Sequence, residues 1–286
     1  MRWKPGARGN VEDRRGRPGG RAALPVGGGL VGVIVTVLIL VLSGGGGYGV
    51  NNPFEQFPAQ TQPASGDTMQ NAPDAESELV DFVSFVVGDL RKFWAADFEK
   101  AGREFAPSPL VLFRQGVNTG CGPGSAATGP FYCPADRKMY VDLSFFRELA
   151  NRFQAPGDFA QAYVLAHEYG HHIQTLTGVN QQVESASREN PDQRNALSVR
   201  TELQADCLAG VWAHSTFERG LLEDGDLEEG LTAASSVGDD RIQEQTTGRI
   251  SPETFTHGTA AQRAGWFKRG FEDGDATACD TFSGDI

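Results

Sequence analysis

The sequence predicts an α+β fold that is mainly helical, contains a small β-sheet and is preceded by one transmembrane helix. Three observations lead to this expectation. From about residue 76 onward, apolar side chains recur at steps of three and four residues, which is typical of amphipathic helices. Only two short apolar runs interrupt that pattern as strands would, and few strands beside many helices favour the α+β class. Between Arg21 and Glu55 the chain has no charged side chain, and the apolar run 30–42 lies inside this window.

The elements of the helical part follow in chain order from that spacing. The first helix covers about 76–104 and ends before Pro107, because proline cannot continue a helix. Short strands are expected at 110–113 and 138–143. Further helices are expected at 158–175, 195–219, 226–245 and 258–270.

Charge is distributed unevenly along the chain. The formal net charge of the 286 residues is -12, which argues against nucleic acid as a partner. Residues 1–29, however, carry seven Arg or Lys side chains against Glu12 and Asp13, so this end is +5 and the remainder is -17. Basic residues that precede an apolar segment are retained in the cytoplasm. We therefore expect the N-terminus inside the cytoplasm and the acidic remainder outside it.

The apolar run 30–42 has 13 residues, fewer than the ~20 that span a bilayer. Uncharged glycines on both sides extend the candidate span. A cleaved signal peptide and a buried core helix are alternative interpretations, but the chain shows no A-x-A-like cleavage site and the run has no polar face. We expect a single-pass anchor in the inner (cytoplasmic) membrane. The expected divisions are a basic cytoplasmic segment 1–26, a transmembrane helix 27–50, a flexible linker 51–75 rich in Pro, Gln, Asn and Ser, and an extracytoplasmic domain 76–286.

All four cysteines follow the apolar segment, where an oxidising compartment would permit disulfides. Three pairings are possible for four cysteines. We expect Cys121–Cys133, which closes one local loop, and Cys207–Cys279, which ties down the C-terminal tail. Four free thiols are the alternative. No C-x2-C spacing occurs, so a cysteine metal site is disfavoured.

Residues 167–171 read HEYGH, an H-E-x-x-H motif inside an expected helix. His167 and His171 lie four residues apart, so both imidazoles face one side of the helix and can converge on one ion. Glu168 is rotated by about 100° and can act as a base toward water at that ion. The alternative is an amphipathic helix with solvated histidines. Three of the chain's five histidines cluster at 167, 171 and 172, which weakens that alternative.

A catalytic metal site of this kind needs a third protein ligand. The extended motif with a third histidine is excluded, because residue 177 is threonine. Residues 202–206 read ELQAD, which places Glu202 and Asp206 on one face of another expected helix. Glu202 can ligate the metal, and Asp206 can accept the second N–H of a ligand histidine. An ordinary solvated pair is the alternative, but the apolar neighbours of these carboxylates predict a buried helix, in which unpaired carboxylates are costly.

Four segments in this order resemble a known family. They read GPFYCPADRKMYVDLSFF, HEYGHHIQ, ELQADC and SPETFTHGTAAQRAGWFKRGFEDGD. With the basic N-terminus and the apolar span, they resemble the putative neutral zinc metallopeptidase family of bacteria, and the H-E-x-x-H and E-x-x-A-D pair is similar to gluzincin membrane-associated peptidases. The resemblance implies a zincin-like metallopeptidase domain that uses Zn2+ to cleave peptides or proteins. It implies His167, His171 and Glu202 as ligands and Glu168 as catalytic base.

Other positions carry weaker signals. His257 lies just before the last expected helix and could donate to the oxyanion of a tetrahedral intermediate, with capping or packing as the alternative. His172 is expected to pack or to support a ligand. The strand 138–143 could align an extended peptide by strand addition, or could be only structural. The basic run Arg263, Lys268 and Arg269 is expected on a solvated helix face.

Three functions fit these residues. The preferred one is a membrane-anchored zinc peptidase that acts outside the cytoplasm through zinc-activated water and a glutamate base. A non-catalytic envelope scaffold that keeps zinc for stability is an alternative, although a structural site needs no base. The third is a zinc amidase acting on another envelope polymer.

Overall fold

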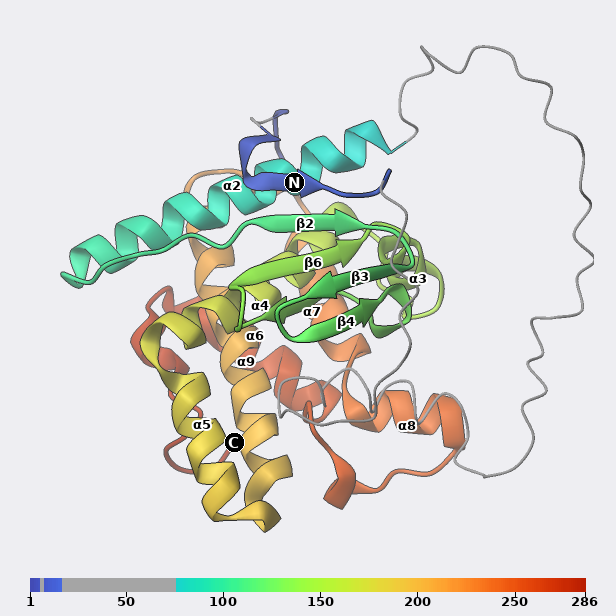
Figure 1. The fold of residues 1–286 in the computed structure, drawn as a ribbon, viewed down its shortest axis with the longest axis vertical. Coiled ribbons are helices and arrows are strands. Elements are labelled where there is room, and N and C mark those ends of the chain that lie inside the picture. Colours follow the sequence, from blue (N-terminus) through green and yellow to red (C-terminus); the bar gives the residue numbers. More distant parts are fainter. Residues whose placement is uncertain (6–7, 17–75) are drawn as a thin grey trace, which may run out of the picture.

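The computed structural model describes residues 1–5, 8–16 and 76–286. Figure 1 shows a small sheet beside a larger group of helices, which confirms the expected mainly helical α+β class. Helices α4 and α6 pack against each other, and α6 packs on α9. The helices are α2 (Ser77–Lys100), α3 (Phe145–Asn151), α4 (Asp158–Thr177), α5 (Val179–Glu189), α6 (Arg194–Glu218), α7 (Asp226–Ser236), α8 (Asp239–Thr247) and α9 (Ala260–Asp273).

The main sheet has four strands in the order β1-β2-β6-β5. β2 pairs in parallel with both β1 and β6, whereas β5 pairs antiparallel with β6. β3 and β4 form a separate antiparallel hairpin. The strands are β1 (Val11–Asp13), β2 (Leu110–Phe113), β3 (Gly116–Thr119), β4 (Gly122–Ser125), β5 (Phe131–Cys133) and β6 (Lys138–Asp142).

Both faces of the main sheet are covered, which explains why β2 is an uninterrupted apolar run. Leu110 and Leu112 belong to the large core shared with the helices. Val111 and Phe113 point to the opposite face, where they form a smaller cluster with Val117 of β3. Alternate side chains of β2 are therefore buried in two different cores.

Helix α6 occupies the centre of the helical part and is buried around most of its circumference. It crosses α9 at Gly210 and Gly270, where a Cβ atom on either residue would lie 2.0 Å from a backbone oxygen of the other helix. On another side it meets α4, where a Cβ on Gly170 would lie 3.0 Å from the Cα of Ala205. Glycine therefore permits the close approach of α6 to α9, and it brings the H-E-x-x-H helix directly against α6.

The expected helix 226–245 is in fact two helices, α7 and α8. Gly238 separates them with an extended backbone (φ -69°, ψ 141°). A Cβ on Gly238 would lie 2.2 Å from the backbone nitrogen of Ala260, so the break follows from a tertiary contact. The polar helix α5 and the short elements α3, β1, β3, β4 and β5 were not expected, because none of them contains a sustained apolar pattern.

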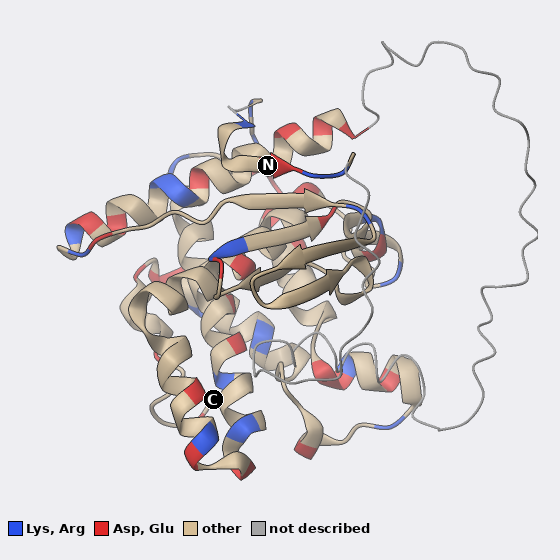
Figure 2. Ribbon diagram, viewed as in Figure 1, with Lys and Arg blue, Asp and Glu red and all other residues tan. Residues whose placement is uncertain are grey.

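The N-terminal residues pack against the domain. β1 extends the main sheet, and the α-ammonium group of Met1 lies 2.7 Å from Asp158 Oδ1 at the start of α4. Trp3 contacts the ring of Phe82 on α2 at a centroid distance of 5.4 Å. Figure 2 shows basic residues of this segment near acidic residues at the start of α2, where Arg8 pairs with Asp81. Residues 17–26 of the expected cytoplasmic segment lie outside the described residues, so the expected division 1–26 stays a prediction.

The expected membrane span 27–50 and linker 51–75 lie outside the described residues. Among the helices that the structure does describe, none is both long enough and apolar enough to cross a bilayer.

Both expected disulfides are confirmed. Cys121–Cys133 joins the β3–β4 hairpin to the end of β5. Cys207–Cys279 fastens the C-terminal tail to α6 next to Asp206. All four cysteines are paired, which fixes two elements that border the site described below.

Candidate metal centre

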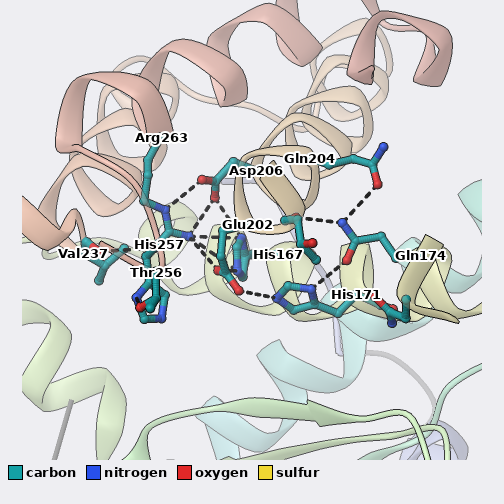
Figure 3. A network of polar contacts seen from close by, with 12 residues as sticks. His167, His171, Gln174, Glu202, Gln204, Asp206, Val237, Thr256, His257 and Arg263 are labelled. Carbon is teal, nitrogen blue, oxygen red and sulfur yellow. Dashed lines mark hydrogen bonds and ion pairs between the residues drawn. The ribbon is translucent and has the colours of Figure 1, made fainter. Parts of the chain in front are cut away.

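Two histidines of α4 and one glutamate of α6 converge on a common point (Figure 3). The Nε2 atom of His167 lies 3.1 Å from Glu202 Oε2, and the Nε2 atom of His171 lies 3.5 Å from Glu202 Oε1. One potential ligand atom from each residue lies within 4.8 Å of the others. The i, i+4 spacing puts both imidazoles on one face of α4, and the packing at Gly170 places Glu202 opposite them.

The hydrogen bonds of the two imidazoles leave the correct nitrogen available for a metal. His167 uses Nδ1 toward Asp206 Oδ1 at 2.8 Å, and His171 uses Nδ1 toward Gln174 Oε1 at 2.8 Å. Glu202 Oε1 is buried and has no hydrogen-bond partner among the described residues. The Nε2 atoms of both histidines face Glu202. Together with the unsatisfied carboxylate oxygen they match the donor set of a three-ligand zinc site with an open position.

The charge of the site also suits a divalent cation. Three carboxylates are buried at the site, those of Glu168, Glu202 and Asp206. The guanidinium of Arg263 contacts two of them, Glu202 and Asp206. Burial disfavours the imidazolium form of His167, but Asp206 and Glu202 outweigh burial and raise its pKa to about 9. Burial also opposes ionisation of Glu202, yet the neighbouring histidines keep the pKa of this carboxyl well below its usual range. The surroundings therefore favour positive charge at this point.

Glu168 lies beside the ligand histidines and is only 9% exposed. Burial raises the pKa of its carboxyl, while His171, His167 and a hydrogen bond from the backbone N–H of Tyr132 act in the opposite direction. A carboxylate that is more basic than usual is suited to accepting a proton from water.

Asp206 is completely buried and accepts hydrogen bonds from three groups. Besides His167, it accepts from the hydroxyl of Tyr163 and from Arg263, whose Nε lies 2.8 Å from Oδ2 and whose Nη2 lies 3.0 Å from Oδ1. The expected hydrogen bond between Asp206 and His167 is thus present. A two-pronged guanidinium contact holds the carboxylate in one orientation.

Arg263 was wrongly expected on a solvated face; it is 3% exposed and lies at the metal centre. A signal for its burial was present in the sequence. Trp266 and Phe267 follow it by three and four residues, so all three share one face of α9, and both aromatic residues are buried.

His257 lies in the loop before α9 and lines the same cleft as the metal centre. Its Nδ1 atom is 3.1 Å from Asp239 Oδ1. Asp239 Oδ2 accepts the backbone N–H of His257 at 2.6 Å, and it also accepts those of Thr256 and Gly258. The loop is therefore held by Asp239, and the Nε2 atom of His257 has no hydrogen-bond partner among the described residues.

His172 packs in the core on a different face of α4 from His167 and His171. Its ring bonds to the hydroxyl of Tyr132 at 3.0 Å and to the carbonyl of Ala106 at 2.6 Å. Burial lowers its pKa to about 4, so the ring is neutral at neutral pH. His172 therefore fixes β5 relative to α4.

The cleft in front of the metal centre is bordered by β5, α4, α5, α6 and the loop that carries His257. β5 is the outer strand of the main sheet, whereas β6 is paired on both sides. The expectation that the strand 138–143 aligns a peptide is therefore wrong, because β6 has no unpaired edge. Within the part of the chain that the structure describes, β5 has such an edge. Apolar side chains on the walls of the cleft are Pro130, Phe131, Phe145, Phe153, Val183 and Ile242.

These features define a class of site: two histidines and a glutamate that could hold a metal ion, with a buried carboxylate beside them, in the wall of a largely apolar cleft. The chain belongs to the family described as putative neutral zinc metallopeptidase, whose pattern matches residues 1–282. The resemblance noted from the motifs is thereby confirmed. The family description implies zinc as the metal and hydrolysis as the activity.

Two relatives illustrate the similarity. The chain is 45% identical over 298 residues to "Uncharacterized protein YpfJ" of Escherichia coli (strain K12), covering 100% of both chains. It is 50% identical over 185 residues to "Uncharacterized protein Rv2575" of Mycobacterium tuberculosis (strain ATCC 25618 / H37Rv), covering 61% of this chain and 62% of that protein. No solved structure matches the chain. The expected zincin-like fold therefore stays a prediction.

Proposed function

We propose that the protein is a zinc peptidase that hydrolyses peptide bonds in substrates bound along the cleft. One observation carries the proposal: His167, His171 and Glu202 present a three-ligand donor set with Glu168 directly beside it. A purely structural zinc site would need a fourth protein ligand and no base. Zinc held by these residues would lower the pKa of a water molecule and polarise the substrate carbonyl.

The chain's own residues supply the remaining chemistry. Glu168 accepts a proton from the attacking water and delivers it to the leaving amine. His257, when its imidazole carries both protons, donates from Nε2 to the oxygen that becomes negative in the tetrahedral intermediate. Asp239 holds the other ring nitrogen and thus the direction of the donor. The free edge of β5 pairs with the substrate backbone, because an extended peptide can add to an unpaired strand.

We further propose that the protein works outside the cytoplasm and is held at the cytoplasmic membrane through residues 27–50. Two disulfides support this location, because disulfides persist in oxidising compartments. β1 is part of the main sheet, so we place residues 1–16 on the same side of the membrane as the domain.

The substitution Glu168→Gln tests the proposed activity on the purified full-length chain. It keeps the size of the side chain but removes the base, so cleavage of a peptide library should fall about 10²- to 10⁴-fold. Zinc content by elemental analysis should stay near one ion per chain, as in the parent. Glu272→Gln, an exposed change on α9, is the matched control and should cleave like the parent.

Two results would contradict the proposal. One is a parent protein that contains no zinc after purification without chelators. The other is a Glu168→Gln variant that cleaves peptides at the parental rate. If the protein cleaves another envelope polymer and leaves peptides intact, it is a zinc amidase and not a peptidase.

A further inference from the structure

Gln174 is a completely buried polar residue on α4, three residues after His171. Its carboxamide makes three hydrogen bonds. Oε1 faces Nδ1 of His171 at 2.8 Å, and Nε2 donates to the backbone oxygen of Thr201 at 2.7 Å and to Gln204 Oε1 at 3.1 Å. Figure 3 shows the amide lying between the ligand histidine and α6. A buried amide with these partners is held in one orientation.

The partner on α6 determines the orientation of the amide. The backbone oxygen of Thr201 can only accept a hydrogen bond, so the NH2 group of Gln174 must face it. The amide oxygen must then face His171, whose Nδ1 must carry the proton. A neutral imidazole protonated on Nδ1 has its lone pair on Nε2, the atom that faces Glu202. One backbone carbonyl therefore decides, through Gln174, which nitrogen of His171 is available for a metal.

The two ligand histidines are held by different chemistry. His167 is held by the carboxylate of Asp206, which is itself paired with Arg263. His171 is held by the neutral amide of Gln174. The neutral contact adds no further negative charge beside Glu202. It also joins α4 to α6 next to a ligand, since Thr201 directly precedes Glu202.

We propose that Gln174 is a positioning residue of the metal centre, which fixes the tautomer and direction of His171 and thereby sets the affinity for zinc. This inference rests on the proposed function of the same site. Partners that orient a ligand histidine change metal affinity when they are removed, whereas residues that only fill space change stability.

The test compares zinc binding by three full-length proteins stripped of metal: the parent, Gln174→Met and the control Gln204→Met. The methionine at 174 keeps the volume but removes the bond to His171. The control removes a partner of the Gln174 amide and a bond to the backbone oxygen of Cys279, but touches no proposed ligand. Zinc dissociation constants come from competition with a chromogenic chelator. Visible spectra with Co2+ report the ligand geometry without any activity assay.

We expect Gln174→Met to raise the zinc dissociation constant about 10- to 100-fold and to shift the cobalt spectrum, while the control stays close to the parent. Unchanged zinc affinity and an unchanged cobalt spectrum in Gln174→Met, even with a lower melting temperature, would overturn the inference. If Gln174→Met does not fold, Gln174→Asn replaces it with the same two criteria, because its amide is too short to reach both partners. Failure of the proposed function looks different: the parent itself would bind neither metal.

Discussion

At the scale of single residues, the position of the His257 side chain depends on Asp239. Asp239 accepts its Nδ1–H and the backbone N–H groups of its loop. The same hydrogen bonds keep the pKa of Asp239 below its usual range although burial raises it, so the carboxylate stays ionised. The imidazole is thereby aimed from the loop into the cleft.

We expect His257→Phe to reduce kcat for peptide cleavage about 10²- to 10³-fold, because one donor to the oxyanion is lost. Zinc content should not change, since His257 does not belong to the ligand group. Steady-state kinetics with a peptide found in the library screen measure the effect. His214→Gln, a change on α6 outside the residues that line the cleft, is the control. If the His257→Phe variant has the parental kcat, His257 does not donate to the oxyanion.

Arg263 should be essential for stability. Arg263→Met leaves the carboxylate of Asp206 buried without its cation, and breaking a buried pair in this way costs about 3–5 kcal/mol. Denaturant unfolding of the metal-free protein measures this loss. Arg269→Met is the matched control, because Arg269 is exposed and only covers the ring of Trp266. Equal unfolding free energies for both variants would show that the guanidinium of Arg263 is not needed.

The sequence predicted those site residues whose relation is local. His167, Glu168 and His171 lie within one helical turn, and Glu202 and Asp206 lie within another, so helix periodicity alone groups them. The structure brings both groups together. Arg263 and Gln174 escaped prediction because their partners lie on other helices, and periodicity contains no information on which helices meet.

At the scale of elements, the crossing of α6 and α9 holds the centre together. α6 carries Glu202 and Asp206, and α9 carries Arg263. Glycine at 210 and at 270 lets the two backbones touch. The sequence predicted both helices, but their contact could not be inferred, since each glycine alone looks only like a weak position in a helix.

Gly270→Ala should therefore destabilise the fold by about 1–3 kcal/mol, because the added methyl group has no space and the helices must separate. Its Cβ would lie 2.0 Å from a backbone oxygen of α6. Gly265→Ala on the same helix is the matched control, since nothing lies within 4 Å of its Cβ position. The control should stabilise the protein by about 0.5–1 kcal/mol through helix propensity. Thermal unfolding compares the two, and a shift in the same direction for both would contradict the role of the crossing.

At the scale of the whole molecule, β1 joins the N-terminal residues to the main sheet of the domain. β1 has only three residues, and its sequence VED contains no apolar run, so nothing local predicts a strand. Its strand character comes from pairing with β2. Of the basic side chains that resemble a topology signal, Arg8 has an acidic partner on α2 and Arg14 has one in β1. If the chain crossed a membrane once between β1 and β2, these two strands would lie on opposite sides of the membrane and could not pair.

This arrangement predicts a specific zero-length crosslink. Lys138 Nζ of β6 lies 3.1 Å from Glu12 Oε2 of β1, so a carbodiimide should join them in the full-length protein in isolated membranes. Mass spectrometry of the monomer band detects the joined peptides. Lys138→Arg keeps the charge but should abolish the product, and the Lys268–Glu272 pair, at 3.5 Å within α9, verifies that the reagent has reacted. If the Lys268–Glu272 pair is crosslinked but no Glu12–Lys138 product forms, β1 does not pair with the domain in the membrane. The interpretation of a single membrane crossing then holds. Detection of the Glu12–Lys138 product within one chain excludes a single crossing, because both residues must then lie on the same side of the membrane.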